Sequence, residues 1–373
     1  MDRAEFVVVG AGITGLTLAF FLSRAGADVL VIDRAGIGAG ASGVQPGGVR
    51  QQWSTEINCR LARESVEFYA HLDDELGYTV DAHLDRCGYL FVALGDDALR
   101  SMRENVELQN RCGVPSRMVT AAEAGELVPG LSTDAITGGA WCAEDGYFDR
   151  PQTVVEAFEH AAAARVAVAE VVALDRAADD WSVQTTNGAV RARTVVLAAG
   201  VDTRDLLRPL GVDVPIEPEP RHLFLSEPVA GRLVDPLVVV GERSFAAKHL
   251  ANGRVLASDL AAAGDAALHR ERWRATVAAG IAEFLPALSY VSFPVLASGL
   301  YDVTPDHQPI VGRIGEQDGL WIAAGYSGHG FMLAPAISRR LADAMLDDGG
   351  TPIPEFAPDR FDGARLVRER GVV

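Results

Sequence analysis

The chain of 373 residues is longer than a single hydrophobic core usually supports, so we expect two domains. Its content of 49% hydrophobic and 23% charged residues is typical of a globular protein and excludes a disordered one. The net charge of −18 disfavours nucleic acids and anionic membranes as partners, although acidity of this size also serves solubility alone.

The pattern of cysteines and the length of the apolar runs indicate the cellular compartment. Cys59, Cys87, Cys112 and Cys142 are scattered without a CxxC pair or a histidine cluster, which supports neither a disulfide framework nor a metal site. No apolar run approaches the roughly 20 residues of a membrane helix, and no signal-peptide pattern precedes the first strand. We therefore expect a cytoplasmic protein with free thiols, no metal ion and no membrane span.

The chain opens with a strand, a helix and a second strand. Residues 6–9 are a short apolar run suited to a buried parallel strand. A helix is expected from about 14 to 24, before Gly26, and residues 28–34 read "DVLVIDR", an apolar strand that ends in an acid. This order is a βαβ unit.

Longer and more irregular segments follow as far as residue 164. The stretch 35–53 is rich in glycine and small residues and too irregular for a helix, and loops of this length are usually functional. After it we expect a helix over 54–77, a strand over 88–94, a helix that ends near 113, strand and turn over 129–150, and a helix over 151–164 with Pro151 in its first turn and Asp149 as its cap.

The remaining chain divides into strands, a second domain and a closing helix. The strands are expected over 165–176, 181–188 and 189–200, with an Asn-Gly turn between the last two. Short strands with prolines over 214–301, and one helix near 266–283, predict a mostly antiparallel second domain. Residues 319–346 then predict a strand, a glycine-rich turn and a long helix, so the two domains interleave along the chain.

The first glycine motif, "GAGITG", predicts a dinucleotide site. Gly10 permits the tight turn, Gly12 lets the backbone approach a pyrophosphate, and Gly15 lets the helix pack closely on the strand. The exposed amides and dipole at the start of the helix favour phosphates. Asp33 follows Gly15 by 18 residues, at the end of the second strand, where a carboxylate accepts hydrogen bonds from a ribose.

Three features favour FAD over NAD as the dinucleotide. The motif opens the chain, and it is followed by "GASG", in which Ser42 can reach the pyrophosphate from the far side. The distant strand "VVLAAG" over 195–200 ends as if it returns beside the same cofactor.

With these motifs in family order, the chain resembles the FAD-dependent oxidoreductases of the D-amino-acid oxidase superfamily, in the branch of glycine oxidase, sarcosine oxidases and amino-acid dehydrogenases. The matching stretches cover most of the chain and begin with the βαβ unit, followed by "GASGVQPGGVRQQWSTEIN", "VVLAAGVDT", "YDVTPDHQPIVG" and "GLWIAAGYSGHGFMLAPAISRRLA". The resemblance implies an α/β FAD-binding Rossmann-like domain (GR2-type) interleaved with an α+β substrate domain built on a mostly antiparallel sheet. We place the first at 1–84, 145–213 and 302–365, and the second at 85–144 and 214–301.

The resemblance also implies which residues bind FAD. The ADP half is expected to contact residues of the first turn, the second strand and the following loop, with Val171 at the adenine and two residues beside the pyrophosphate: Gly10, Gly12, Ile13, Thr14, Gly15, Asp33, Arg34, Ala41, Ser42, Val171, Ala199 and Gly200. The flavin ring is expected above the loop of Arg50, with its pyrimidine end at the turn "GYSGHGFM", where Gly328, Gly330, Phe331 and Met332 lie.

The expected chemistry needs positive potential more than it needs an acid or base. Amine oxidation by a flavin moves a hydride from the carbon that bears nitrogen to flavin N5, and the imine then hydrolyses. Negative charge accumulates at the N1–C2=O edge of the reduced flavin, where the backbone amides of 328–332 and Arg50 can stabilise it. Tyr301 matches an active-site tyrosine of monomeric sarcosine oxidases. His329 is a third candidate for the chemistry, although its side chain could simply bond nearby backbone, as Arg50 could form a structural ion pair.

Departures from the family pattern leave the substrate contacts open. Monomeric sarcosine oxidases bind the substrate carboxylate with an arginine and a lysine where this chain has Trp53 and Met332, and glycine oxidase uses an arginine where Tyr301 stands. We expect the carboxylate to be bound by other residues, or the substrate to be something other than a simple small amino acid. The candidates for substrate binding are Trp53, Arg221, His222, Arg243, Lys248 and Tyr326.

Further departures concern oxygen and the flavin linkage. The oxygen-activating lysine of monomeric sarcosine oxidase is replaced by Val255, so either oxygen or another electron acceptor remains possible. The positions that tether flavin in some relatives are Gly299 and either Val44 or Gln45, which predicts noncovalent FAD.

The sequence therefore predicts oxidation of a primary or secondary amine, with two alternatives. The first is a 2-hydroxy-acid oxidase or dehydrogenase on the same scaffold. The second is an accessory FAD subunit of a hetero-oligomeric dehydrogenase, and both homo- and hetero-oligomers remain open.

Overall fold

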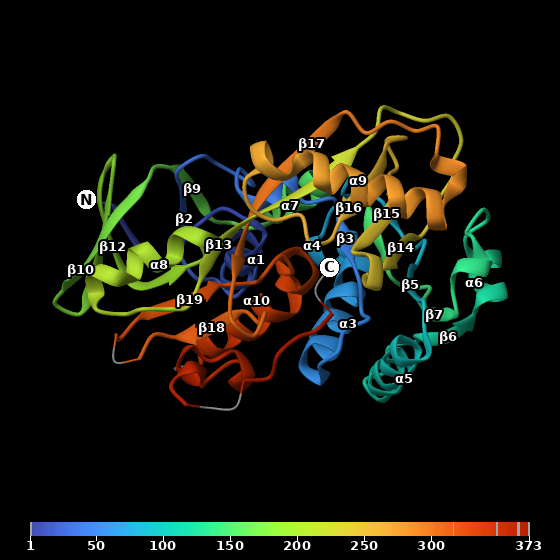
Figure 1. Cartoon of the computed structure of the whole chain (residues 1–373). Coiled ribbons are helices and arrows are strands. Elements are labelled where there is room, and N and C mark those ends of the chain that lie inside the picture. The colour runs from blue at the N-terminus through green and yellow to red at the C-terminus, as the bar shows by residue number, and fades with distance from the viewer. Residues whose placement is uncertain (1, 316, 348–349, 364–365, 372–373) are drawn as a thin grey trace.

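The computed structural model describes residues 2–315, 317–347, 350–363 and 366–371, and it contains two large sheets joined through a helical layer (Figure 1). The first sheet has the order β10-β11-β12-β1-β2-β9, and β19 pairs with β12 and with β18. Its strands are β1 (Asp2–Val9), β2 (Val29–Asp33), β9 (Arg165–Val168), β10 (Val171–Ala177), β11 (Asp180–Thr185), β12 (Gly188–Leu197), β18 (Ile310–Arg313) and β19 (Leu320–Ala324).

The centre of the first sheet is parallel and apolar. The pairs β9–β2, β2–β1, β1–β12 and β12–β19 are all parallel, and the strands read as nearly unbroken apolar runs because both faces are covered. One face packs on four helices, α1 (Ile13–Arg24), α3 (Glu56–Ala70), α7 (Pro151–Ala161) and α10 (Gly330–Leu346). The carboxyl ends of β1, β2, β12 and β19 therefore meet at one edge, where the expected site residues follow.

The second sheet is antiparallel except for one pair. Its order is β17-β13-β16-β15-β14-β5-β7-β6, and only β14–β5 is parallel. Its outer face packs on α9 (Ala266–Phe284), and α5 (Asp96–Arg111) and α6 (Ala121–Leu127) lie at its far end (Figure 1). The strands are β5 (Tyr89–Ala93), β6 (Arg117–Thr120), β7 (Gly138–Cys142), β13 (Glu217–Leu225), β14 (Leu237–Val240), β15 (Phe245–His249), β16 (Val255–Asp259) and β17 (Val295–Val303).

Short elements connect the two sheets. A small third sheet has the order β3-β8-β4 and lies between them, and three short helices complete the described regular structure apart from 3-10 turns. These elements are β3 (Gly48–Val49), β4 (Leu84–Asp85), β8 (Gly146–Phe148), α2 (Ala41–Val44), α4 (Leu72–Leu76) and α8 (Thr203–Leu207).

The interleaved fold class is confirmed, and four local predictions are wrong. The stretch 35–53 contains the short helix α2, and the helix expected over 54–77 breaks at His71 into α3 and α4. The single strand expected over 165–176 is two strands, β9 and β10, which pair with β2 and β11 respectively. Asp149 does not cap α7, because its carboxylate accepts the amide of His83 at 2.7 Å instead. The Asn-Gly turn between β11 and β12 is as predicted, and residues 194–197 lie buried beside β1.

The start of α10 is fixed by α3. Pro335 has no amide to donate to the carbonyl of Phe331, one helical turn earlier. The hydroxyl of Tyr69 donates to that carbonyl at 2.7 Å, and the amide of Ala336 donates to the hydroxyl of Ser65 at 3.2 Å. The first turn of α10 therefore keeps a fixed direction although a proline interrupts its hydrogen-bond ladder.

Candidate functional site

The first glycine turn has the close packing that its sequence predicts. Gly10 has φ +113°, and a Cβ on it would overlap the carbonyl oxygen of Ala198 at the end of β12. A Cβ on Gly15 would overlap the carbonyl oxygen of Gly10, and one on Gly12 would lie 3.1 Å from the hydroxyl of Ser42. That hydroxyl accepts the Ile13 amide at 2.9 Å, so the α2 loop lies directly over the start of α1.

Asp33 closes the same turn from the end of β2. One carboxylate oxygen accepts the amide of Ala11 at 2.8 Å, and the other accepts those of Ala35 and Gly36 at 2.8 and 3.0 Å. Because each carboxylate oxygen can accept two bonds, acceptor capacity remains for a ribose. The carboxylate thus shapes the loop around it.

The other residues expected at the ADP half gather around Asp33. Arg34 pairs with Asp202 at 2.8 Å, which brings it to the turn that carries Ala199 and Gly200. Asp33 pairs in register with Val168, the last residue of β9, and Val171 begins β10 just beyond it. The structure therefore brings these predicted residues together from three segments of the chain.

The second glycine turn is held by Asp302 and covered by Tyr301. The carboxylate of Asp302 accepts the Gly325 amide at 2.7 Å, and burial raises the pKa of this carboxyl to about 6. Gly328 has φ +88°, and a Cβ on it would overlap the ring of Tyr301. Burial also raises the pKa of Tyr301, which keeps its hydroxyl protonated.

The two glycine turns are neighbours in space. A Cβ on Gly330 would lie 3.6 Å from Tyr326 and 3.9 Å from the hydroxyl of Thr14. The hydroxyl of Ser338, on α10, donates to the carbonyl of Thr14 at 3.4 Å. Helices α1 and α10 therefore begin side by side, although more than three hundred residues separate them along the chain.

Arg50, Trp53 and His329 form a buried stack beside the second turn. The guanidinium of Arg50 lies 4.0 Å from the centroid of the Trp53 ring, and the Trp53 and His329 rings meet edge to face at 4.6 Å. Burial, followed by the charge of Arg50, lowers the pKa of His329 well below its usual value, so the imidazole is neutral. Its Nε2 atom has no hydrogen-bond partner among the described residues.

The start of α10 offers free donors for an anionic group. The amide of His329 donates to Tyr326 at 2.9 Å, and that of Met332 donates back to His329 at 3.1 Å. Met332 therefore uses its amide within the helix and cannot contribute it, contrary to our expectation. In the described part of the chain, no acceptor is assigned to the amides of Gly328, Gly330 and Phe331.

These features fit an extended dinucleotide that contains a flavin. The glycine turn at α1 excludes side chains where a pyrophosphate would approach, and the α10 turn carries unpartnered amides and the orphaned Nε2 of His329. Gly48 extends this close packing, because a Cβ there would overlap the hydroxyl of Tyr89 and lie 3.6 Å from Met332.

Lys248 lies on the inner face of the second sheet, which faces these turns. Its ammonium is 2.7 Å from the centroid of the Tyr147 ring and donates to Cys87 and to the Asp235 carbonyl, both at 3.1 Å. Burial lowers the pKa of Lys248 to about 8. No carboxylate of the described residues forms an ion pair with this ammonium.

Arg221 shares the face of Tyr301, whereas two other substrate candidates point elsewhere. The Arg221 guanidinium lies 5.7 Å from the Tyr301 ring centroid, pairs with Glu219 and donates to the carbonyl of Leu260. His222, the next residue along β13, stacks on Trp273 of α9. The structure thus puts His222 on the outer face of the sheet, because side chains alternate along a strand.

Arg243 is likewise separated from the turns. It lies in the 3-10 turn after β14 and pairs with Glu283 of α9 at 3.2 Å. Trp53 and Tyr326 do lie at the second turn, both buried. Of the six substrate candidates, the structure therefore brings Trp53 and Tyr326 to the second turn, and Arg221 and Lys248 to the inner face of the second sheet.

Two buried carboxylates at the site escaped the sequence reading. Asp145 accepts the amide of Gln51 at 2.7 Å and the side-chain amide of Gln52 at 2.9 Å, and burial raises its pKa to about 7. Glu369 is fully buried near Arg50. No spacing signals either one, because their partners lie about 90 or more than 300 residues away.

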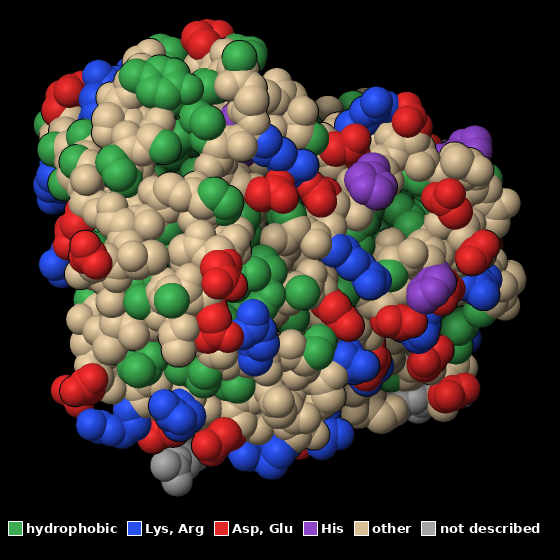
Figure 2. All heavy atoms as spheres, turned by 90° about the vertical axis from the view of Figure 1, so that its right-hand side faces the viewer, with side chains coloured by type: hydrophobic (Ala, Val, Ile, Leu, Met, Phe, Trp, Pro, Cys, Tyr) green, Lys and Arg blue, Asp and Glu red, His purple; other side chains and the backbone are tan. Residues whose placement is uncertain are grey.

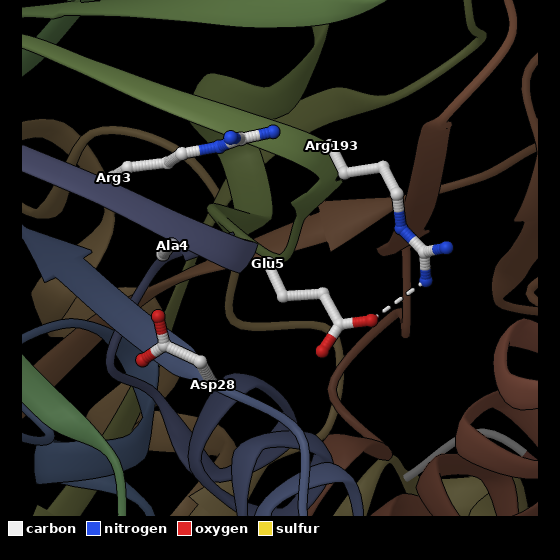
Figure 3. A pocket seen from close by; sticks show the side chains of 5 residues that line it. All are labelled: Arg3, Ala4, Glu5, Asp28 and Arg193. Atoms are coloured by element: carbon white, nitrogen blue, oxygen red, sulfur yellow. Dashed lines mark hydrogen bonds and ion pairs between the residues drawn. The ribbon is translucent and has the colours of Figure 1, made fainter.

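One surface hollow lies away from these turns. It measures about 370 Å³ and is lined by Arg3, Ala4, Glu5, Asp28 and Arg193, with an ion pair between Arg193 and Glu5 at 2.8 Å (Figure 3). These residues lie at the amino ends of the parallel strands. Ligands of such sheets bind at the carboxyl ends, so we assign no function to this hollow.

The surface and the described helices agree with the composition. Acidic and basic side chains are interspersed over the face that carries α5, with no large area of one sign (Figure 2). Within the described residues, no helix is long and apolar enough to cross a membrane, and no group of three potential ligands could hold a metal ion. All four cysteines are free.

Comparison with known proteins finds one family over most of the chain. The family model described as FAD dependent oxidoreductase matches residues 5–344. The glycine oxidase of Pseudomonas aeruginosa is 29% identical over 94% of this chain and 97% of its own. The 4-methylaminobutanoate oxidase (formaldehyde-forming) of Paenarthrobacter nicotinovorans is 28% identical over 93% of this chain, which spans only 44% of that relative. The crystal structure of L-proline dehydrogenase from P. horikoshii has a TM-score of 0.90 and 28% identity, covering 98% of this chain and all of that one.

Proposed function

Because the chain belongs to the family of FAD-dependent oxidoreductases, we propose that it oxidises a primary or secondary amine, an amino acid or a derivative of one. The relatives named for glycine, proline and 4-methylaminobutanoate support this substrate class, since each of these compounds contains both an amine and a carboxylate. The observation that carries the proposal is the meeting of the two glycine turns with Arg50 and Tyr301 beside them.

Residues of both turns would hold the cofactor noncovalently. The first turn, Asp33, Arg34, Ser42, Val171, Ala199 and Gly200 would bind the ADP half, and the α10 turn would bind the ring. Gly299 and Val44 approach each other, and neither can form a covalent tether. Bound FAD would supply the hydride acceptor for the carbon that bears the nitrogen.

The side chains near the ring would stabilise charge and exclude water. Arg50 and the free amides of Gly328, Gly330 and Phe331 provide preorganised positive potential, which stabilises developing negative charge without reorganisation. Tyr301 covers Gly328 and shields the turn from solvent. His329 is neutral and would orient rather than transfer protons.

The carboxylate of the substrate would be bound from the second sheet. Met332 and Trp53 offer no charge, whereas Lys248 and Arg221 present cations on the inner face. Lys248 is buried without an acidic partner among the described residues, so an anionic substrate group would compensate its charge. We assign Lys248 as the main carboxylate ligand.

An anaerobic reduction screen tests the function. The purified protein should be yellow and should release its flavin on acid precipitation. Amino acids or their N-alkyl derivatives, but not 2-hydroxy acids, should bleach the flavin in the absence of oxygen. Bleaching by hydroxy acids alone would select the hydroxy-acid reaction, and no bleaching without a second subunit would indicate an accessory role. A colourless protein that does not take up FAD would refute the proposal.

The same preparation separates the remaining alternatives. We propose a cytoplasmic protein, which fits the free thiols and the absence of a spanning helix in the described residues. Rapid reoxidation of the bleached protein by air would identify an oxidase, and slow reoxidation a dehydrogenase with another acceptor. Light scattering of the purified protein distinguishes a monomer from a homo-oligomer or a hetero-oligomer.

A further inference from the structure

The last described residues form a strap across the site. This C-terminal strap, residues 366–371, runs back to the start of α3 and the loop of Arg50. The Glu369 amide donates to the carbonyl of Asp306 at 3.0 Å. Asp306 is itself held by Arg360 in a buried two-bond ion pair at 2.9 and 3.0 Å. The strap thus has a rigid anchor on its inner side.

The carboxylate of Glu369 accepts five hydrogen bonds. One of its oxygens accepts the amide and hydroxyl of Ser54 at 3.0 and 2.6 Å and the amide of Gly371 at 2.7 Å. The other oxygen accepts the hydroxyl of Thr55 at 2.7 Å and the side-chain amide of Asn58 at 3.0 Å. Of the five donors to this fully buried carboxylate, four tie the strap to residues 54–58, which directly follow the loop of Arg50, and the fifth lies in the strap itself.

The strap also contacts Arg50 itself. One terminal nitrogen of the guanidinium donates to the carbonyl of Gly371, and the other donates to the Gln52 carbonyl at 3.0 Å. No carboxylate of the described residues forms an ion pair with Arg50. Burial lowers the pKa of Arg50, and the charge of Glu369 is the strongest influence that opposes this lowering. Glu369 is therefore the main countercharge of Arg50 without touching it.

We propose that Glu369 is a positioning residue that fixes the direction of the Arg50 guanidinium, so that the C-terminal strap completes the active site. The inference rests on the proposed function, in which Arg50 supplies positive potential to the flavin. Without the carboxylate, the strap would loosen, Arg50 would lose the carbonyl of Gly371, and its charge would no longer point in one direction. The reduced, anionic flavin would then lose stabilisation.

The test compares E369A with E369Q in the FAD-loaded protein. Glutamine keeps the volume and one acceptor oxygen, and its amide can donate to the side-chain oxygen of Asn58, which has no partner among the described residues. The midpoint potential of bound FAD is measured by titration with dithionite, which requires no amine substrate. E369A should lower the potential by about 30 mV or more, a tenfold change for a two-electron couple. E369Q should not lower it, because Arg50 stays in place.

Two further measurements separate positioning from a merely structural role. In an R50A background, adding E369A should leave the potential unchanged, because the effect passes through Arg50. Trypsin should cut after Arg368 faster in E369A than in wild type or E369Q, in protein with and without FAD, since the strap lines an open groove of about 670 Å³. E355A, at an exposed acid of the same terminal region, is the matched control and should match wild type.

The outcomes distinguish this inference from the proposed function. An equal potential in wild type and E369A, or an equal shift with and without Arg50, would overturn the inference while the protein still binds FAD. Failure to bind FAD in wild type would overturn the proposed function first. If E369A does not fold, N58A takes its place, because it removes one of the five donors to Glu369. N58A should lower the midpoint potential of bound FAD by a smaller amount.

Discussion

The imidazole of His329 stands edge-on against the indole of Trp53, with ring centroids 4.6 Å apart and planes at 86°. This contact buries the histidine beside a guanidinium that lies 4.0 Å from the same indole. The imidazole therefore stays neutral, and its position at the N-cap of α10 orients the turn.

Replacing His329 by glutamine should leave the pH profile of flavin reduction unchanged in shape. A neutral imidazole has no proton to lose in the assay range, so the rate should fall by less than the roughly 100-fold that a general acid or base contributes. Anaerobic stopped-flow reduction across pH measures this. H71Q, at an exposed histidine of the surface, should match wild type. If the rate of flavin reduction falls at acidic pH in wild type and H71Q but not in H329Q, the prediction is contradicted.

Replacing Gly328 by alanine should cost more stability than the backbone alone explains. Gly328 and Gly26 have nearly equal φ angles, +88° and +90°, so alanine adds a similar left-handed strain of about 1–2 kcal/mol at both. Gly26 has open space around it, whereas a Cβ on Gly328 would overlap Tyr301. Urea unfolding should therefore show G328A to be less stable than G26A. Equal losses would mean that Tyr301 does not pack on the turn.

Stability should depend on pH through Asp145. Burial raises the pKa of its carboxyl from 3.8 to about 7, so the folded protein holds this proton more tightly than the unfolded chain. The contribution of the protonated Asp145 carboxyl to the free energy of unfolding is fully present below pH 3.8 and is lost as pH rises through about 7. The free energy of unfolding of wild type should therefore fall relative to that of D145N by a few kcal/mol across this window.

Urea unfolding at a series of pH values checks the Asp145 prediction. D74N, at an exposed acid of α4, is the control and should follow the wild-type curve. Parallel curves for wild type and D145N would show that Asp145 does not titrate in this range.

Replacing Lys248 by methionine should weaken binding of an amino-acid substrate. Loss of the ammonium should raise KM at least tenfold, about 1.4 kcal/mol, with a smaller change in kcat. The reason is that the ammonium binds the substrate carboxylate equally well in the ground state and in the transition state. In wild type, KM should also rise as pH passes about 8, where the ammonium loses its proton. K248M should lack that rise. R243M alters a cation paired with Glu283 and should leave KM unchanged.

The glycine turns could be predicted from sequence because their determinants are local. The spacing of Gly10, Gly12 and Gly15 is readable within six residues, and the strand and helix around them follow from apolar patterning, although the carbonyl that Gly10 packs against belongs to the distant Ala198. His222 shows the limit of such reasoning. Its candidacy rested on residue type, whereas one step along β13 turns it to the outer face, and only the strand register reveals this.

The buried acids could not be predicted for a different reason. Glu369 stands in "VRERGVV", a charged stretch near the end of the chain that is typical of a solvated tail. Its five donors come from residues 54–58 and from Gly371, so its burial depends on a contact that spans 311 to 315 residues. Asp145 depends in the same way on Gln51 and Gln52.

Lys248 is the only lysine of the chain, and it is 3% exposed. The positive charge on the surface is therefore carried by guanidinium groups, to which amine-selective reagents do not couple. Acylating dyes and cross-linkers would find no accessible side-chain amine on the folded protein. A ligand bound at the inner face of the second sheet would slow the acylation of Lys248. Mass spectrometry could follow this protection in the peptide that contains Lys248.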